Sequence, residues 1–149
     1  MIRSLMVTTA LLFAVNAAPA AQVTYYQLPQ GAFPHDVAPA TNGTVWYSGQ
    51  TKGVLGIFDP KTGKAEHVPL GPGSAPHGVI QGPDGVAWLT DGGQNAIVRF
   101  DPETEKFESF PSDRPNSNVR QMLGRKGEAW IAESGTERIR VIRYPAGTN

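Results

Sequence analysis

The sequence has no cysteine among its 149 residues. No disulfide can therefore stabilise the fold, and stability must come from burial of apolar side chains or from association. An excess of charge of one sign is also missing, because 13 basic residues balance 13 acidic ones and no block of like charge occurs. This balance gives no indication of a nucleic-acid partner or of an anionic membrane surface as partner.

Long apolar runs are missing except at the N-terminus. Arg3 precedes the run LMVTTALLFAV, and residues 18–20 read Ala-Pro-Ala, the small-residue spacing of a cleavage site. This arrangement predicts a secretory signal peptide over residues 1–20, since the run is too short to span a bilayer comfortably and no second run follows it. We therefore expect a periplasmic or secreted domain over residues 21–149, with no membrane span after cleavage.

What the sequence does contain is an internal repeat of 42 residues. A unit that begins PHDV at Pro34 is followed without a gap by one that begins PHGV at Pro76, and NVRQ continues the register from Asn118. Tryptophan recurs with the same spacing, as does the glycine three residues before it, at Trp46, Trp88 and Trp130 and at Gly43, Gly85 and Gly127. The repeats are thus 34–75, 76–117 and 118–149.

Each unit alternates short apolar runs with turn residues. In the second unit the runs are HGVIQ, VAWLT, AIVRF and FESFP, separated by PDG, DGGQN and DPETEK. Proline presets one turn dihedral and glycine accepts a positive one, so these separators predict turns. Four antiparallel strands in roughly 40 to 45 residues indicate an all-β fold built of β-propeller blades. We expect the tryptophan of the second strand to pack between neighbouring blades.

The two ends of the chain favour a shared last blade. VTYYQLP at residues 23–29 resembles a fourth strand without the first three, whereas the third unit ends after its third strand, RIRVIRYP. We expect residues 23–29 to complete the last blade. Three blades cannot close a ring, since propellers have about four to eight. The preferred interpretation is a homodimer with six blades, in which each chain's N-terminal strand completes the other's last blade. The alternative is a shortened relative of a longer propeller, open or unstable.

Titratable side chains recur at one edge of the predicted blades. His77 begins the first strand of its unit and Asp91 ends the second strand, so both belong at the same mouth of a central channel. His35 and Glu133 stand at equivalent positions in the first and last units. A channel lined in this way is a candidate ligand site.

Simpler structural roles remain open for several of the polar residues. A Pro-His element can also be a turn whose imidazole hydrogen-bonds to a neighbouring blade. We expect His67 to be exposed on an outer strand. Asp59 and Asp101, each followed by proline, are expected to form turns.

The repeat motifs resemble those of a known family. PHGV with GPDGVAWLTDGGQNAIVRFDP, PHDV with GTVWYSGQ, and GEAWIAESGTERIRVI are similar to the virginiamycin B lyase (streptogramin B lyase) family of propellers. The resemblance covers residues 23–145. It implies Mg²⁺-dependent opening of a cyclic depsipeptide antibiotic by elimination across its ester, and hence antibiotic resistance.

The resemblance also implies roles for four residues. His77 corresponds to the family's catalytic Pro-His histidine and His35 to a second channel histidine, while Asp91 and Glu133 correspond to the acidic position that would hold Mg²⁺. A histidine with a pKa near neutrality suits removal of the proton beside an ester carbonyl. Mg²⁺ takes oxygen ligands and would hold the developing enolate charge.

The sequence departs from the family pattern at three positions. Val119 stands in the last unit where the lyases have a Pro-His histidine, Gly49 replaces an acid in the first unit, and Asp91 is one methylene shorter than the family's glutamate. These departures favour an alternative function, a non-catalytic exported propeller module that binds a small ligand or a cell-wall fragment.

Overall fold

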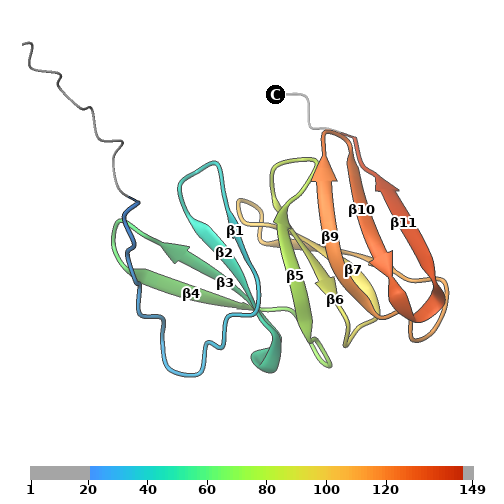
Figure 1. The fold of residues 1–149 in the computed structure, drawn as a ribbon, viewed down its shortest axis with the longest axis horizontal. Helices are drawn as coiled ribbons and strands as arrows, with labels where there is room; N and C mark the ends of the chain where they lie inside the picture. The colour runs from blue at the N-terminus through green and yellow to red at the C-terminus, as the bar shows by residue number, and fades with distance from the viewer. Residues whose placement is uncertain (1–20, 146–149) are drawn as a thin grey trace, which may run out of the picture.

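Residues 21–145 are described by a computed structural model as three antiparallel β-sheets that stand side by side like the blades of a fan (Figure 1). The expected signal peptide, residues 1–20, lies outside the described residues. The first sheet contains β1 (Val37–Pro39), β2 (Val45–Gly49), β3 (Val54–Asp59) and β4 (Lys64–Pro69). The second contains β5 (Pro76–Gln81), β6 (Ala87–Asp91), β7 (Ala96–Asp101) and β8 (Lys106–Pro111). The third contains β9 (Val119–Arg125), β10 (Glu128–Glu133) and β11 (Arg138–Arg143).

The repeat in the sequence is a repeat of strands. β2, β3 and β4 each begin 42 residues before β6, β7 and β8, and every strand pairs only with its neighbours in the sequence. Short 3-10 helices, η1 (Gln50–Lys52) and η2 (Ser134–Thr136), follow the second strand in the first and third sheets. The predicted all-β fold and the four-stranded units are therefore confirmed for the first two repeats, and the third repeat stops after its third strand.

The turn glycine before each tryptophan is required by the backbone. Gly43, Gly85 and Gly127 have φ angles of 88°, 87° and 77°. Residues with a side chain rarely adopt such positive angles, whereas glycine does so without steric cost. The glycine thus closes the hairpin between the first and second strands of each sheet.

The third sheet departs from strict 42-residue spacing in its first strand. The strand pairs that show this are Pro76 with Asp91 and Val79 with Leu89 in the second sheet, and Val119 with Glu133 and Met122 with Ile131 in the third. Asp91 and Glu133 are 42 residues apart, whereas Pro76 and Val119, which pair with them, are 43 residues apart. One extra residue therefore precedes β9.

This slip corrects the sequence-based alignment of the last repeat. Val119 takes the place of Pro76, and Arg120, not Val119, takes the place of His77. Between the equivalent strand pairs Gln81 with Ala87 and Gly124 with Ala129, the connection in the third sheet is one residue shorter, which restores the register at Trp130. The constant tryptophan spacing concealed the insertion.

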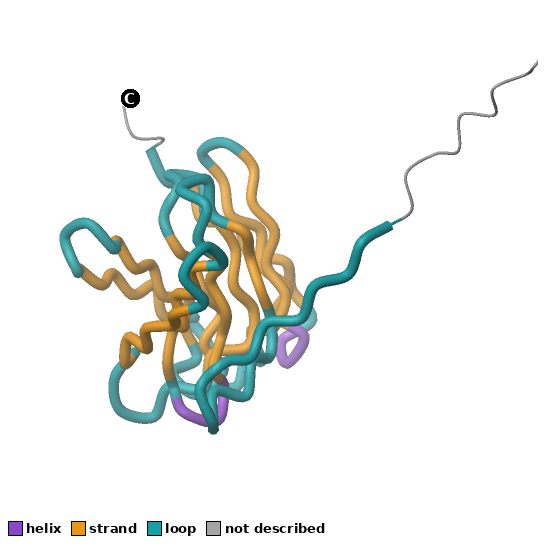
Figure 2. Tube along the Cα trace, turned by 90° about the vertical axis from the view of Figure 1, so that its left-hand side faces the viewer, coloured by secondary structure: helices purple, strands orange, loops and turns teal. Residues whose placement is uncertain are grey.

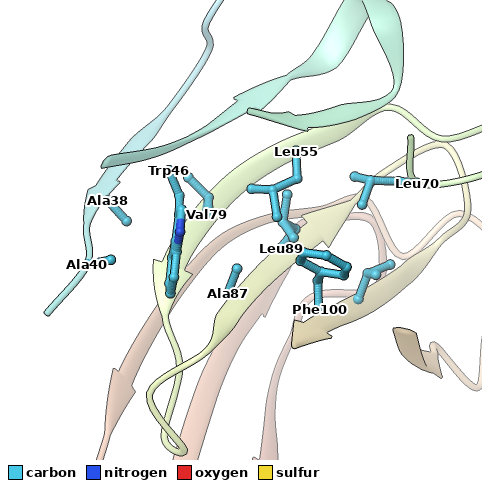
Figure 3. Close-up of a cluster of buried hydrophobic side chains, with 10 residues drawn as sticks. Ala38, Ala40, Trp46, Leu55, Leu70, Val79, Ala87, Leu89 and Phe100 are labelled. Atoms are coloured by element: carbon cyan, nitrogen blue, oxygen red, sulfur yellow. The ribbon is translucent and has the colours of Figure 1, made fainter. Parts of the chain in front are cut away.

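Two apolar cores fill the spaces between adjacent sheets. Trp46 lies in the core between the first and second sheets, together with Leu55, Val79 and Leu89 (Figure 3). Trp88, fully buried, lies in the core between the second and third sheets. The expectation that tryptophan packs between blades is confirmed at these two positions. Trp130 has no following sheet to pack against, and its side chain is 38% exposed.

The N-terminal segment lies on the first sheet of its own chain, and its expected pairing with the last blade of a partner chain stays a prediction. Residues 23–29 form no strand, and Figure 2 shows them as loop throughout. The Tyr26 ring contacts Phe58 edge-on at 5.1 Å, and Leu28 packs on a cluster that includes Tyr47. The segment therefore covers the first sheet and lies across the fan from β11 (Figure 1). Because the three sheets do not close, the segment does not reach the third sheet of its own chain.

The described residues include no helix with the length and apolar character needed to cross a bilayer.

Candidate functional site

Two histidines from adjacent repeats meet at one edge of the fan. His35 precedes β1 and His77 is the second residue of β5. Their ring centroids are 4.1 Å apart, with the planes inclined at 50°. His35 is exposed, whereas His77 is partly buried. The two histidines that sequence reasoning placed in one channel are therefore direct neighbours.

Hydroxyl groups fix the first strands of adjacent sheets to each other. Ser48 Oγ accepts a hydrogen bond from the Asp36 N–H (3.1 Å) and donates one to the His77 carbonyl (2.6 Å). Thr90, one repeat later, accepts from the Gly78 N–H and donates to the Arg120 carbonyl, both at 2.7 Å. The backbone carbonyls of His77 and Arg120 are therefore held by the same kind of hydroxyl contact, one repeat apart.

Close approach of β5 and β9 depends on Gly78. A methyl group at this position would lie 2.8 Å from the Arg120 carbonyl oxygen, so an alanine would push the two strands apart. On the other side of β5, the Val79 N–H donates to Asp36 Oδ2 at 3.0 Å. The backbone on both sides of His77 is thus held by contacts with the neighbouring sheets.

His77 has an unsatisfied polar atom. Its Nδ1 is buried and is the one buried side-chain nitrogen or oxygen between residues 21 and 145 without a hydrogen-bond partner. Burial lowers the pKa of His77 below its ordinary 6.5, and electrostatic interaction with His35 and Arg120 lowers it further, against smaller opposing effects of the Arg120 backbone and of Asp36. The imidazole is therefore neutral at pH 7 and able to accept a proton.

Arg120 belongs to the site, although sequence reasoning missed it. Its exposed side chain lines a pocket of about 340 Å³ with His77, Gln50 and Asn118. Its Nε donates to Asn118 Oδ1 at 2.9 Å. The signal that could have found Arg120 is the shorter turn of the third repeat, RKG in place of GPDG, because a deletion there requires an insertion before β9.

Asp91, expected to bind a metal, is engaged by its own chain. The carboxylate is fully buried. Oδ1 accepts the backbone N–H groups of Ala75 (2.9 Å) and Gln94 (3.0 Å), and Oδ2 accepts the Ser74 hydroxyl (2.5 Å). Asp91 thus fixes the loop that leads into β5, and it orients His77 only through that loop.

Glu133, the equivalent residue of the third sheet, is also buried and engaged. Oε2 accepts from Arg138 Nη2 at 2.7 Å, and Oε1 accepts from the Ser112 hydroxyl at 3.0 Å. The Arg140 guanidinium lies 3.8 Å from Oε1. Glu133 therefore neutralises arginines at the edge of the fan.

These surroundings do not fit a Mg²⁺ site. Mg²⁺ needs available oxygen ligands in near-octahedral geometry, whereas the carboxylates of Asp91 and Glu133 are enclosed by donors of this chain. No group of three or more His, Asp or Glu residues suited to a metal occurs within residues 21–145. We therefore assign no metal to these residues.

The remaining polar residues behave as the sequence indicated. His67 is exposed on the outer strand β4, and its Nε2 lies 2.5 Å from the hydroxyl of Tyr47, a buried residue whose pKa burial raises. Asp59 accepts the Lys61 N–H at 2.8 Å, and Asp101 accepts the Glu103 N–H at 3.0 Å, so both form turns.

No protein-family model matches the sequence, and no curated protein does. Solved structures do match the fold. Virginiamycin B lyase from Staphylococcus aureus superposes with a TM-score of 0.70 at 21% identity, over 83% of this chain and 45% of its own. The extracellular domain of a proposed one-component system from B. thetaiotaomicron gives 0.65 at 20% identity, over 82% and 17%. An auxiliary nutrient binding protein from Bacteroides ovatus gives 0.55 at 17% identity, over 72% and 33%.

The chain thus spans less than half the length of each of these proteins. At identities of 17–21%, the likeness concerns the backbone arrangement and not the chemistry. What the chain shares with virginiamycin B lyase and with the extracellular and nutrient-binding proteins is the arrangement of its sheets, a propeller-like fan.

Proposed function

We propose that this chain is an exported propeller-type module that binds a small organic ligand at the pocket beside His77. The observation that carries the proposal is the buried, unpartnered Nδ1 of His77. A buried polar atom without a partner costs about 1–3 kcal/mol. A ligand that hydrogen-bonds to this atom would recover that free energy, which favours binding.

Three further features support a binding role. The pocket beside His77 has a volume of about 340 Å³, enough for a small ligand. The hydroxyl bridges of Ser48 and Thr90 hold its walls in place before a ligand arrives, which reduces the entropy cost of binding. The carboxylates expected to hold a catalytic metal serve the fold instead. Export is proposed from residues 1–20, and two of the structural neighbours are an extracellular domain and a nutrient binding protein.

Imidazole NMR tests the binding proposal. The side-chain nitrogens of His35 and His77 are followed while uncharged probes, N-acetylglucosamine and N-acetyl dipeptide amides, and a type B streptogramin are added. We expect saturable shifts at His77 and at its neighbour His35, and the His35 shifts should be lost in His77→Gln and kept in the control His67→Gln. If no probe, charged or uncharged, moves the His77 resonances, the binding proposal is wrong.

A second candidate function, elimination at an ester, is favoured by the lowered pKa of His77. A neutral imidazole beside a second histidine suits removal of a proton next to a carbonyl. Incubation with a type B streptogramin separates the alternatives. A linear product of unchanged mass supports elimination, and a product heavier by one water indicates ester hydrolysis. An intact antibiotic leaves only the binding function. Loss of activity on chelation would contradict our assignment of no metal.

We further propose that two chains associate into one closed ring. The third sheet presents Leu123 and Ile139, each 76% exposed, on the same face as Trp130. Trp88 and Ile97, the equivalents of Trp130 and Ile139 one repeat earlier, are fully buried by the following sheet. A partner's first sheet would bury the exposed face in the same way, and the partner's residues 23–29 would then be available to pair with β11.

A further inference from the structure

We propose that the ligand of this pocket carries an oxyanion, a carboxylate or a phosphate, which Arg120 binds beside His77. The inference rests on the proposed binding function and names the chemical class of the ligand. It begins from the register of β9, which places Arg120 at the position that His77 occupies in β5 and His35 in the first repeat. Three successive repeats thus present a protonatable or cationic side chain at one edge of the fan.

Within residues 21–145, Arg120 differs from the other arginines of the third sheet in forming no ion pair with an acidic residue. Arg138 pairs with Asp113 and Glu133, while Arg125 and Arg143 both pair with Glu128. For Arg120, the hydrogen bond within residues 21–145 is from Nε to the neutral Asn118 amide oxygen. Arg120 lines the pocket, and a planar guanidinium can bind a carboxylate or phosphate in a bidentate manner.

Arg120 is the one fixed charge among the residues that line the pocket. The carboxylates of Asp91 and Glu133 are buried and engaged by donors of the chain. Asp36 faces His77 across the first and second sheets, but its Oδ2 accepts the Val79 N–H, and its effect on the pKa of His77 is smaller than the effects of His35 and Arg120. An anion entering the pocket would therefore meet the Arg120 guanidinium and no carboxylate among the lining residues.

Binding of an anion is expected to be linked to protonation of His77. When the imidazole is protonated, both ring nitrogens become donors, and Nδ1 is the atom without a partner. An oxyanion held by Arg120 would offset the repulsion that His35 and Arg120 exert on that proton. Affinity should therefore rise as the pH falls below about 6.5, the ordinary pKa of histidine.

The experiment follows the His77 imidazole by NMR during pH titrations of the full chain, with and without inorganic phosphate or acetate, at ionic strength matched with sodium chloride. We expect phosphate or acetate to raise the pKa of His77 and sodium chloride to leave it unchanged. The probe with the larger effect identifies the oxyanion as phosphate-like or carboxylate-like. Arg120→Gln should weaken binding about tenfold, the typical loss when a bidentate charged contact is removed. Arg120→Lys keeps the charge but not the planar guanidinium, so its affinity for the anion should lie between that of the unmodified chain and that of Arg120→Gln.

Lys126→Gln is the matched control. It removes the same charge from the turn at the other end of β9, so it should leave anion binding unchanged. Equal weakening in Arg120→Gln and Lys126→Gln would reduce the effect to general electrostatics and overturn the inference. If uncharged probes bind at His77 but phosphate and acetate do not, the inference is wrong while the binding function stands. If nothing binds, both are wrong.

Discussion

At the scale of single residues, the backbone of His77 is fixed by a hydrogen bond, whereas one nitrogen of its ring has no hydrogen-bond partner in the described part of the chain. The Ser48 hydroxyl fixes its carbonyl, while its buried Nδ1 has no partner among the described residues. Polar groups are rarely buried in this way without a functional reason. This contrast between a fixed backbone and an unpaired, buried ring nitrogen distinguishes His77 from His67, which is exposed and contacts Tyr47.

The lowered pKa of His77 predicts how stability depends on pH. The unfolded chain has a histidine pKa near 6.5, and in the folded chain burial lowers the pKa of His77 below that value. The unfolded state therefore binds more protons between the two values, so the free energy of unfolding should fall as the pH is lowered from 7 through 6.5. Urea unfolding at several pH values measures this slope. His77→Gln should flatten it and His67→Gln should not, and an unchanged slope in His77→Gln would contradict the assignment.

The surroundings of Asp91 predict a stability role and not metal binding. Asp91→Asn replaces a carboxylate oxygen that accepts hydrogen bonds with an amide that donates them, inside a fully buried site. We expect a loss of about 2–4 kcal/mol in the free energy of unfolding, since hydrogen bonds to a charged group contribute about 1.5–3 kcal/mol each. Glu66→Gln, at an exposed position of β4, should change stability little. Thermal unfolding checks both, and an increase of the melting temperature with Mg²⁺ in the unmodified chain would contradict this role.

At the scale of elements, the first strands of the sheets are joined by the hydroxyls of Ser48 and Thr90, and the third sheet ends the series. The residue that corresponds to them in β10 is Ala132, which has no hydroxyl and is exposed. Among the described residues, this position therefore carries a hydroxyl in the two sheets that another sheet follows. In the third sheet, which no described sheet follows, it carries none.

Thr90→Val tests the bridge with almost no change in volume. The valine removes the hydroxyl that serves both the Gly78 N–H and the Arg120 carbonyl. Leaving these backbone groups unpaired should lower the free energy of unfolding by about 1–3 kcal/mol and shift the backbone resonances of β9. Thr62→Val, in the exposed turn between β3 and β4, is the matched control and should have a small effect. Equal effects of the two variants would show that the bridge contributes little.

Most elements could be predicted from the sequence because the repeat preserves its spacing. Strands β2 to β8, their turns and the packing of Trp46 and Trp88 follow directly from apolar alternation and turn residues. Arg120 could not be found in this way, because an insertion and a compensating deletion left Trp130 in register. The pairing of residues 23–29 with the last blade of a partner chain stays a prediction, since the sequence pattern of a strand does not say which edge is within reach.

The engaged carboxylates could not be predicted either. A pattern of residues places Asp91 and Glu133 at the ends of their strands, but it does not reveal which donors surround them. Two of the three partners of Asp91, Ser74 and Ala75, come from a loop 17 and 16 residues earlier, and the partners of Glu133 include Ser112 from the preceding loop. Tertiary contacts of this kind decide whether a carboxylate is available to a metal.

At the scale of the whole molecule, the fan has two unlike outer faces. The outer face of the first sheet buries Tyr47 and Phe58 beneath the N-terminal segment. The outer face of the third sheet leaves Leu123, Trp130 and Ile139 exposed. An exposed apolar face beside an unpaired strand edge favours association.

The proposed dimer predicts the mass of the protein in solution. Light scattering on a sizing column should give twice the chain mass, because burial of the Trp130 face stabilises the pair. Trp130→Glu places a charge on that face and should give the monomer with its fold intact, as judged by circular dichroism. Lys61→Glu, at a turn remote from the face, should remain dimeric. A monomeric unmodified chain would contradict the closed ring.

The sequential order of the strands has a consequence for how the chain folds. Every strand pair joins neighbours in the sequence, so each sheet closes only short loops of backbone as it forms. Short loops cost less entropy to close than long ones, so pairing between neighbouring strands favours faster folding than pairing between distant strands. During synthesis the first sheet could form before the second has left the ribosome, and each later sheet would then add its core to a surface already in place. The three sheets would thus fold in the order in which they are translated.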